Sequence, residues 1–313
     1  MQVLKCWKLA SRISKIPKPR HCSSRFLSVS KFKMTTGKRK FSTMSDELDY
    51  LRARVKDLEA KEEVQNRNKY HRIGSGASHD QSPNPSWKKR ETQPMPFPEE
   101  TGFQSMVPRD MKSVYQFVIS SVVPRPIAFV STVNVDGNIK ANLAPFSYFM
   151  AVCHDPLTLA FSTCTKRGAV KKDTLNNLES NGECVVNIIS EWFVESANFC
   201  SGDFPDDVDE FEVAGLTKLS SDVVRPPRVK EAAVQLECKL KHKYEIVNDK
   251  DEHTATMCVV EVVKSHVKKE LYDPEKGVVK FEGYRPISRL GGTTYGKVGD
   301  TFSLPRPEKD EFR

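Results

Sequence analysis

The sequence predicts a mainly β fold, built as a closed or partly closed barrel with helical insertions. The clearest indication lies in residues 234–246, where apolar and polar side chains alternate as in a half-buried strand of an antiparallel sheet. Residues 254–267 follow the polar turn 248–252 and are the expected hairpin partner. The remaining pattern contains many strands and few helices, which also indicates a barrel.

The other elements follow from local patterns. Strands are expected where Val, Ile and Phe are frequent or where one face is apolar, over residues 116–121, 127–133, 157–163 and 183–189. A helix is expected over 168–181, because the segment has one apolar face and ends in Asn181-Gly182, a C-terminal capping pair. A second, short helix is expected over 191–200, and an acidic loop over 203–210.

The formal charge of +8 comes from the first part of the chain. Residues 1–45 carry 12 Lys and Arg and no acidic residue, whereas the remainder carries 37 basic and 41 acidic residues, a net charge of −4. A nucleic-acid-binding surface would concentrate positive charge in the folded part. The distribution therefore argues against nucleic-acid binding.

Residues 1–44 are rich in Arg, Lys and Ser and contain scattered apolar side chains, a composition typical of a mitochondrial transit peptide. Cleavage is expected near Phe41. The alternatives are a disordered basic leader, or an extension upstream of a cytoplasmic form that starts at Met34 or Met44. No apolar run approaches the roughly 18 residues of a membrane span, so no membrane-spanning helix is expected.

Two segments precede the globular domain, which is expected over 103–313. Residues 45–66 predict a short amphipathic helix that docks on its own domain or on a partner, capped by Ser45. Its apolar positions have heptad spacing over only about two heptads, too few for a coiled coil, and are Leu48, Leu51, Val55 and Leu58. Residues 67–102 are expected to be a linker, because Gly, Ser, Asn and Pro are frequent there.

The residue types argue against several kinds of site. The eight cysteines include no C-x-x-C pair and no clustered His partners, so no metal site is expected. Cys184, Cys238 and Cys258 fall in predicted strands as small buried hydrophobes, which fits a reducing compartment. The sequence contains no G-x-S-x-G, G-x-G-x-x-G or Walker motif, so a serine hydrolase and a Rossmann or P-loop nucleotide site are unsupported.

The stretch 121–174 combines strands with side chains that suit a phosphate. Asp136-Gly137 is expected to form a hairpin turn, a loop rich in backbone donors is expected from residue 142, and Ser, Thr, Lys and Arg gather between 162 and 174. Hydroxyl, ammonium and guanidinium groups together suit a phosphate dianion. The alternative is that this basic run is the solvated start of the following helix.

Several short motifs occur in a fixed order between Ser121 and Tyr295: PRPIAFVST at 124–132, DG at 136–137, NLAPFSYF at 142–149, DP at 155–156, KDT at 172–174, Asn177, VVN at 185–187 and RLGG at 289–292. In this order and spacing they resemble the flavin reductase-like family, and more narrowly its flavoredoxin-type branch, associated with flavoprotein oxygenase systems. The resemblance implies a split β-barrel that binds FMN non-covalently at the interface of a homodimer. It also makes a partner oxygenase a candidate.

The resemblance implies which residues hold the cofactor. The flavin ring would be lined by one segment, Asn142, Leu143, Ala144, Pro145, Phe146 and Ser147. Backbone amides of this segment would face the pyrimidine oxygens and stabilise the reduced flavin, and Pro145, which has no N–H, would shape the loop. The ribityl phosphate would be held, with the help of the dipole of the helix expected to begin near 168, by Ser162, Thr163, Lys166, Arg167, Lys172 and Thr174.

Four further residues receive more general roles. Asp173 is assigned to capping or to orienting a basic neighbour. Arg289 and Tyr295 would approach the flavin or the substrate. Arg125, between two prolines, is either structural or reaches the site.

We therefore expect an FMN-dependent oxidoreductase with NAD(P)H as electron donor. No catalytic residue is assigned, because the protein's task is to position donor and acceptor. Two alternatives stay open: an FMN-binding electron-transfer or storage protein without NAD(P)H activity, and a flavin-free interaction scaffold. Flavin content and NAD(P)H oxidation would separate the three.

Overall fold

The computed structural model describes residues 50, 53, 56–57, 82–93, 95–98, 102–135, 140–166 and 168–307. It divides the chain into two units, Met1–Glu62 and Glu63–Arg313. In the first unit, the predicted leader lies outside the described residues, and the described positions within the predicted helix are helical: Tyr50, Ala53, Lys56 and Asp57. In the second unit, the described part of the predicted linker contains turns and bends but no helix or strand.

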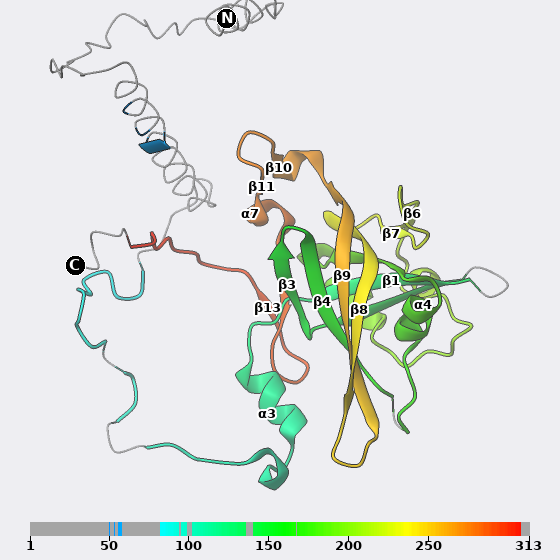
Figure 1. The fold of residues 1–313 in the computed structure, drawn as a ribbon, viewed down its shortest axis with the longest axis horizontal. Helices are drawn as coiled ribbons and strands as arrows, with labels where there is room; N and C mark the ends of the chain where they lie inside the picture. The colour runs from blue at the N-terminus through cyan, green and yellow to red at the C-terminus, as the bar shows by residue number, and fades with distance from the viewer. Residues whose placement is uncertain are drawn as a thin grey trace, which may run out of the picture. The chain divides into compact units, whose positions relative to one another are not determined.

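Seven antiparallel strands form the main sheet of the second unit, in the order β2-β1-β5-β8-β9-β4-β3 (Figure 1). Their bounds are β1 Ala128–Asn134, β2 Lys140–Phe146, β3 Phe149–His154, β4 Leu157–Cys164, β5 Glu183–Ile188, β8 Val234–Val247 and β9 His253–Val267. The strands predicted over 127–133, 157–163, 183–189, 234–246 and 254–267 are confirmed. β1 and β2 pair as the predicted hairpin requires, and the turn between them lies outside the described residues.

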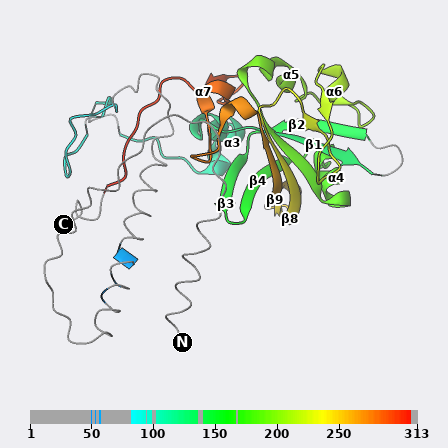
Figure 2. The same ribbon diagram turned by 90° about the horizontal axis from the view of Figure 1, so that it is seen from above.

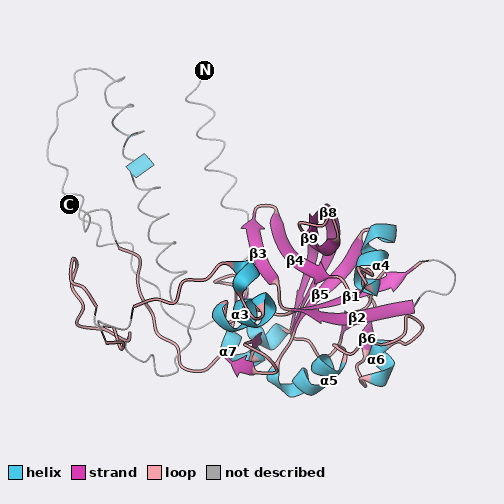
Figure 3. Cartoon of the chain, turned by 90° about the horizontal axis from the view of Figure 1, so that it is seen from below, coloured by secondary structure: helices cyan, strands magenta, loops and turns pink. Residues whose placement is uncertain are grey.

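Strand β1 lies between two hydrophobic cores. Phe129 packs in one core with residues of α5 (Val194–Phe199) and α6 (Glu210–Val213), whereas its neighbour Val130 packs in the other core with residues of α4 (Asp173–Asn181). Figure 2 and Figure 3 show α4 on one side of β1 and β2, with α5 and α6 on the opposite side. Successive side chains of a strand point to opposite faces, so the apolar residues of β1 contribute to both cores. Its buried polar residues Ser131 and Thr132 have hydrogen-bond partners, Ser131 with the Pro227 carbonyl and Thr132 with Asn177.

The sheet curls into a partly closed barrel. β2 and β3 are its edge strands, yet β2 also contacts β4, the neighbour of the opposite edge. The long strands β8 and β9 extend past their neighbours as a two-stranded ribbon (Figure 1). Residues 241–247 of β8 are exposed on both faces, so the half-buried pattern predicted for this strand ends at Leu240.

The strand predicted over 116–121 is wrong, because these residues belong to helix α3 (Val114–Ser121). Ser113 caps this helix by accepting a hydrogen bond from the Gln116 N–H at 3.2 Å. Val and Ile are frequent in strands, and their presence here gave a strand-like composition. Of the helix residues only Ile119 is buried, so the local cap rather than core packing marks where the helix begins.

The predicted helix start near 168 is also wrong, because α4 begins at Asp173. Gly168 (φ 78°) and Ala169 (φ 59°) have a left-handed backbone, which cannot belong to a right-handed helix. The predicted C-terminal cap is confirmed: Gly182 has φ 71°, and its N–H donates to the Leu178 carbonyl.

The remaining elements are short. They are the 3-10 turns η4 Pro108–Asp110, η5 Glu191–Phe193 and η6 Lys269–Leu271, the helix α7 Phe281–Tyr284, and the strand pairs β6 Lys218–Leu219 with β7 Arg228–Val229, β10 Tyr272–Asp273 with β11 Val278–Val279, and β12 Ile287–Arg289 with β13 Tyr295–Lys297. The helix predicted over 191–200 is η5 followed directly by α5. In the part of the chain that the structure describes, no helix is long and apolar enough to cross a membrane.

Candidate functional site

An open cleft lies where the edge strand β2, the segment leading into α4 and the loop after α5 meet. Its volume, including space open to solvent, is about 470 Å³, and its lining consists of Asn142, Ala144, Pro145, Lys166, Lys172, Asp173, Thr174, Cys200, Ser201, Gly202, Asp203, Phe204 and Glu210. A second hollow of about 520 Å³ shares Asn142, Asp173 and Glu210 with the cleft. The two are therefore neighbouring parts of one depression.

Six of the predicted flavin-binding residues line this cleft: Asn142, Ala144, Pro145, Lys166, Lys172 and Thr174. They come from β2, from the segment before α4 and from the first turn of α4. The fold thus brings the predicted ring-binding and phosphate-binding segments to one place, which their separation along the chain does not by itself require.

The other predicted residues lie elsewhere. Leu143 and Phe146 belong to the two hydrophobic cores. Thr163 is buried, and its hydroxyl donates to the Thr256 carbonyl at 3.3 Å. The cleft lining also lacks Ser147, Ser162 and Arg289. Arg167 lies outside the described residues.

The backbone of β2 does not form the amide-rich loop that the sequence suggested. Residues 140–146 are an edge strand, whose N–H groups point alternately toward β1 and outward. At the outward positions, the Leu143 N–H donates to Glu210 Oε2 at 3.0 Å, and Pro145 has no N–H. This wall of the cleft therefore offers side chains and carbonyl groups rather than a row of free amides.

Glu210 closes the acidic side of the cleft. The residue is 8% exposed, and burial raises the pKa of its carboxyl group. Hydrogen bonds that the carboxyl group accepts from backbone N–H groups lower the pKa and offset part of this rise. The sequence predicted residues 203–210 only as an acidic loop, so the site role of Asp203 and Glu210 was missed. The acidic run itself was visible, but the contacts of Asp203 with Lys166 and of Glu210 with the Leu143 N–H depend on the fold.

A buried polar network joins β2 to α4. Asn142 Nδ2 donates to Thr174 Oγ1 at 2.9 Å and lies 3.4 Å from Thr132 Oγ1. The Thr132 hydroxyl also accepts from Asn177 Nδ2 at 3.0 Å. Because Thr132, Thr174 and Asn177 are buried, these bonds satisfy groups that would otherwise be desolvated without partners.

Two ammonium groups reach the cleft in different settings. Lys166 Nζ lies 3.5 Å from Asp173 Oδ2 and 3.1 Å from Asp203 Oδ1. Burial by itself lowers the pKa of Lys166, but the two carboxylates outweigh it and hold the pKa above its ordinary value. Lys172 Nζ lies 5.9 Å from the centroid of the Phe146 ring. None of the ion pairs of the described residues includes Lys172. Lys172 is therefore better placed than Lys166 to bind an anion.

Arg125 has a structural role. Its guanidinium donates to the carbonyls of Ile119, Val122 and Leu290 at 2.7, 2.6 and 2.9 Å and is buried. These bonds tie the end of α3 to the turn after β12. The sequence left two roles open for Arg125, a structural one and one in the site. These three hydrogen bonds support the structural role.

Arg289 and Tyr295 lie against each other. The Arg289 guanidinium carbon is 4.4 Å from the centroid of the Tyr295 ring, and the Tyr295 hydroxyl donates to Asn198 Oδ1 at 2.7 Å. These contacts connect the β12–β13 hairpin to α5. The predicted role of Arg289 and Tyr295 toward a flavin or a substrate stays a prediction.

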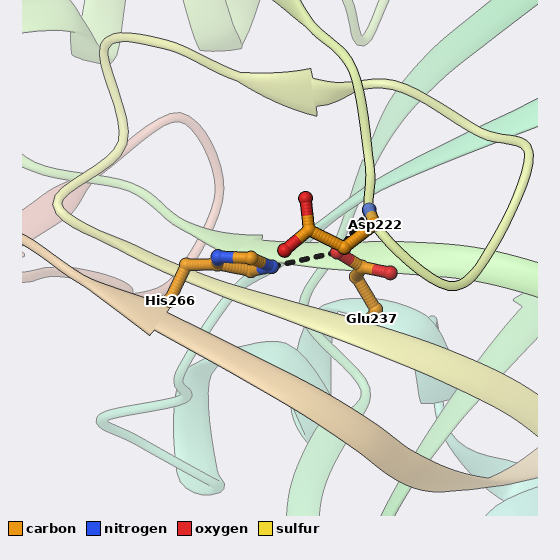
Figure 4. Close-up of side chains that lie close together, drawn as sticks. All are labelled: Asp222, Glu237 and His266. Carbon is orange, nitrogen blue, oxygen red and sulfur yellow. Dashed lines mark hydrogen bonds and ion pairs between the residues drawn. The ribbon is translucent and has the colours of Figure 1, made fainter.

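A His and two carboxylates gather away from the cleft. The side-chain atoms of Asp222, Glu237 and His266 that could bind a metal ion lie within 4.8 Å of one another (Figure 4). Glu237 accepts hydrogen bonds from the backbone N–H groups of 222–224 and lies 2.6 Å from His266 Nε2, while Asp222 pairs with Lys264 at 2.6 Å. Both carboxylates thus have partners, and we assign the group a structural role, tying a loop to β8 and β9.

Comparison with known proteins identifies the family. The model of the flavin reductase like domain matches residues 120–288. This chain belongs to the flavin reductase-like family. The uncharacterized protein BH2278 of Halalkalibacterium halodurans is 38% identical over 202 residues, which cover 64% of this chain and 95% of that protein.

Solved structures agree with this family. Nitrilotriacetate monooxygenase component B from Bacillus cereus is 35% identical, with a TM-score of 0.61 over 65% of this chain and 99% of that chain. A flavin reductase-related protein of Shewanella frigidimarina with a split barrel domain is 20% identical, with a TM-score of 0.54 over 62% of this chain and 91% of that chain, a likeness of fold alone. The predicted split barrel and family are confirmed, and together they support a flavin-related redox function.

Proposed function

We propose that this protein is an FMN-dependent oxidoreductase that binds FMN non-covalently in the cleft beside β2 and takes electrons from NAD(P)H. The observation that carries the proposal is the convergence of Lys166, Lys172 and Asn142 on one cleft, in a chain of the flavin reductase-like family.

Two ammonium groups and a small apolar surface in the cleft suit an anionic ligand with an apolar body, and the same lining carries the carboxylates of Asp173, Asp203 and Glu210. Lys172 and Lys166 would hold the phosphate, because ammonium groups bind phosphate as point charges. Ala144 and Pro145 provide apolar surface, and Asn142 stands beside them on β2. Bound FMN would supply the hydride-accepting chemistry. The residues of this chain would bind and orient it, with the Asn142–Thr174 bond holding β2 against α4.

Exposed apolar side chains support a homodimer, which we propose as the functional form. Met150 and Val152 on the edge strand β3 are 59% and 53% exposed, and Tyr244 on the β8–β9 ribbon is 66% exposed. Large exposed apolar surfaces commonly mark interfaces. Mass measurement in solution tests this proposal, and a monomer at micromolar concentration would contradict it.

Two further proposals concern the protein's setting. The likeness to component B of a monooxygenase supports a partner oxygenase that receives electrons from this protein. The composition of residues 1–44 supports targeting to mitochondria. Co-purification with an oxygenase and the location of a C-terminally tagged chain test the two proposals separately.

The first experiment is an absorbance spectrum of the purified full chain, followed by release and identification of any flavin and by NADH and NADPH oxidation with added FMN. We expect bands near ~370 and ~450 nm, released FMN and nicotinamide oxidation. FMN without nicotinamide oxidation would support the electron-transfer or storage alternative. A colourless protein that does not quench FMN fluorescence would overturn the cofactor assignment and favour the scaffold alternative.

A further inference from the structure

The carboxylate of Asp203 occupies an anion-binding position at Lys166. Asp203 Oδ1 lies 3.1 Å from Lys166 Nζ, closer than Asp173 Oδ2 at 3.5 Å. All three residues line the cleft. One of the two ammonium groups expected to meet a ligand phosphate is therefore already held between two carboxylates of its own chain.

Two aromatic rings fix the loop that carries Asp203. The rings of Phe204 and Phe199 lie 5.4 Å apart, and the Phe204 ring covers Gly202 so closely that an added Cβ would come within 2.8 Å of it. Asp203 follows Gly202 directly, so this packing places its side chain at the cleft. The Asp203 side chain is itself 81% exposed, and an ion pair as exposed as this is weak enough for a ligand to displace.

The two carboxylates at Lys166 differ in how readily they can leave. Asp173 is the first residue of α4, where the positive end of the helix favours a negative charge. Asp203 is in a loop and has no such support. A phosphate that approaches Lys166 would repel both carboxylates. A change of side-chain rotamer can move the carboxylate of Asp203 away from Lys166.

We infer that Asp203 is an internal anion that competes with the flavin phosphate for Lys166, and that it limits how strongly the site prefers FMN over riboflavin. This inference rests on the proposed function. FMN must displace Asp203 in order to place its phosphate at Lys166, whereas riboflavin has no phosphate and leaves the ion pair intact. Removing the charge of Asp203 therefore strengthens the binding of FMN and leaves the binding of riboflavin unchanged.

The test compares Asp203→Asn with Asp207→Asn in the full chain. Both substitutions remove one negative charge from the same loop, but none of the ion pairs of the described residues includes Asp207, and it does not line the cleft. Dissociation constants for FMN and for riboflavin are measured by quenching of flavin fluorescence at low salt. We expect Asp203→Asn to bind FMN about two- to fivefold more tightly, the range that corresponds to one exposed ion pair. Riboflavin binding should not change, and Asp207→Asn should match the wild type.

A second pair of variants tests whether the effect passes through Lys166. In a Lys166→Met background, Asp203→Asn should no longer tighten FMN binding. Equal FMN affinity of Asp203→Asn and wild type, or equal tightening of FMN and riboflavin, would overturn the inference while leaving the proposed function in place. Failure of every variant and of the wild type to bind either flavin would instead overturn the proposed function, and the inference with it.

Discussion

The side-chain amide of Asn142 donates to the hydroxyl of Thr174 at 2.9 Å, and this bond ties the edge strand β2 to the first turn of α4. Both residues line the cleft, and Thr174 is buried. An edge strand has a partner strand on one side only, so its position depends more than that of a central strand on such side-chain contacts. The wall of the cleft is therefore held by a polar bond as well as by apolar packing.

Asn142→Ala and Thr174→Val should each lower the free energy of unfolding by about 1–2 kcal/mol, because each leaves a partner without its hydrogen bond. The double variant should lose less than the sum of the single losses, by about 0.5–1.5 kcal/mol. Urea unfolding of the four proteins measures this coupling. Asn176→Ala, at an exposed position of α4, is the control and should change little. Strictly additive losses would contradict the contact.

Lys172→Met should weaken FMN binding about tenfold, the value of one charge-assisted contact of ~1.4 kcal/mol, and should leave riboflavin binding unchanged. The loss should shrink as salt is added, because salt screens exposed charges. Lys171→Met removes the same charge one residue away, where the ammonium pairs with Glu179 at 2.7 Å. Fluorescence titration at two salt concentrations compares the variants, and equal weakening of FMN binding in both would argue against a specific role of Lys172.

The strands of this fold could be predicted because side-chain alternation follows directly from strand geometry. The errors arose at the starts of two helices, which depend on local backbone details. Ser113 caps α3, whose composition is strand-like. Gly168 and Ala169 adopt a left-handed backbone and delay the start of α4, and a glycine in a sequence does not reveal the sign of its φ angle.

The basic side of the cleft could be predicted, and its acidic side could not. Lys166, Lys172 and Thr174 are close in sequence, so their common site needs little of the tertiary fold. Glu210 reaches the Leu143 N–H only after α6 packs on β2. The prediction of a row of free amides at residues 142–147 was wrong for a similar reason. In a strand, the direction in which an N–H group points depends on the side on which the partner strand lies.

Arg125→Met should lower the free energy of unfolding by about 3 kcal/mol or more, because three backbone carbonyls lose a charged donor inside the protein. FMN affinity, measured under conditions where the variant is folded, should stay within about twofold of wild type, since no Arg125 atom lines the cleft. Arg109→Met, at an exposed position of η4, is the control for loss of charge. A variant of full stability with impaired FMN binding would show that Arg125 acts in the site instead.

Glu237 should make stability depend on pH in the acid range. Burial by itself raises the pKa of its carboxyl group, but the backbone N–H groups of 222–224 and His266 outweigh it, and the pKa lies below the ordinary value of 4.5. A carboxyl group whose pKa is lower in the folded than in the unfolded state stabilises the fold above its unfolded pKa. This stabilisation is lost as the pH falls below about 4.5 and through the folded pKa.

Glu237→Gln should therefore unfold at a lower temperature than wild type at pH 7, and the gap should narrow as the pH falls from 5 toward 3, since the wild type then loses the contribution that the variant lacks throughout. Thermal unfolding followed by circular dichroism in half-unit pH steps measures the gap. Glu275→Gln, at an exposed position between β10 and β11, should follow the wild type at every pH. A gap of constant size from pH 7 to pH 3 would show that the side chain stabilises the loop by shape and hydrogen bonding alone, with no contribution from its charge.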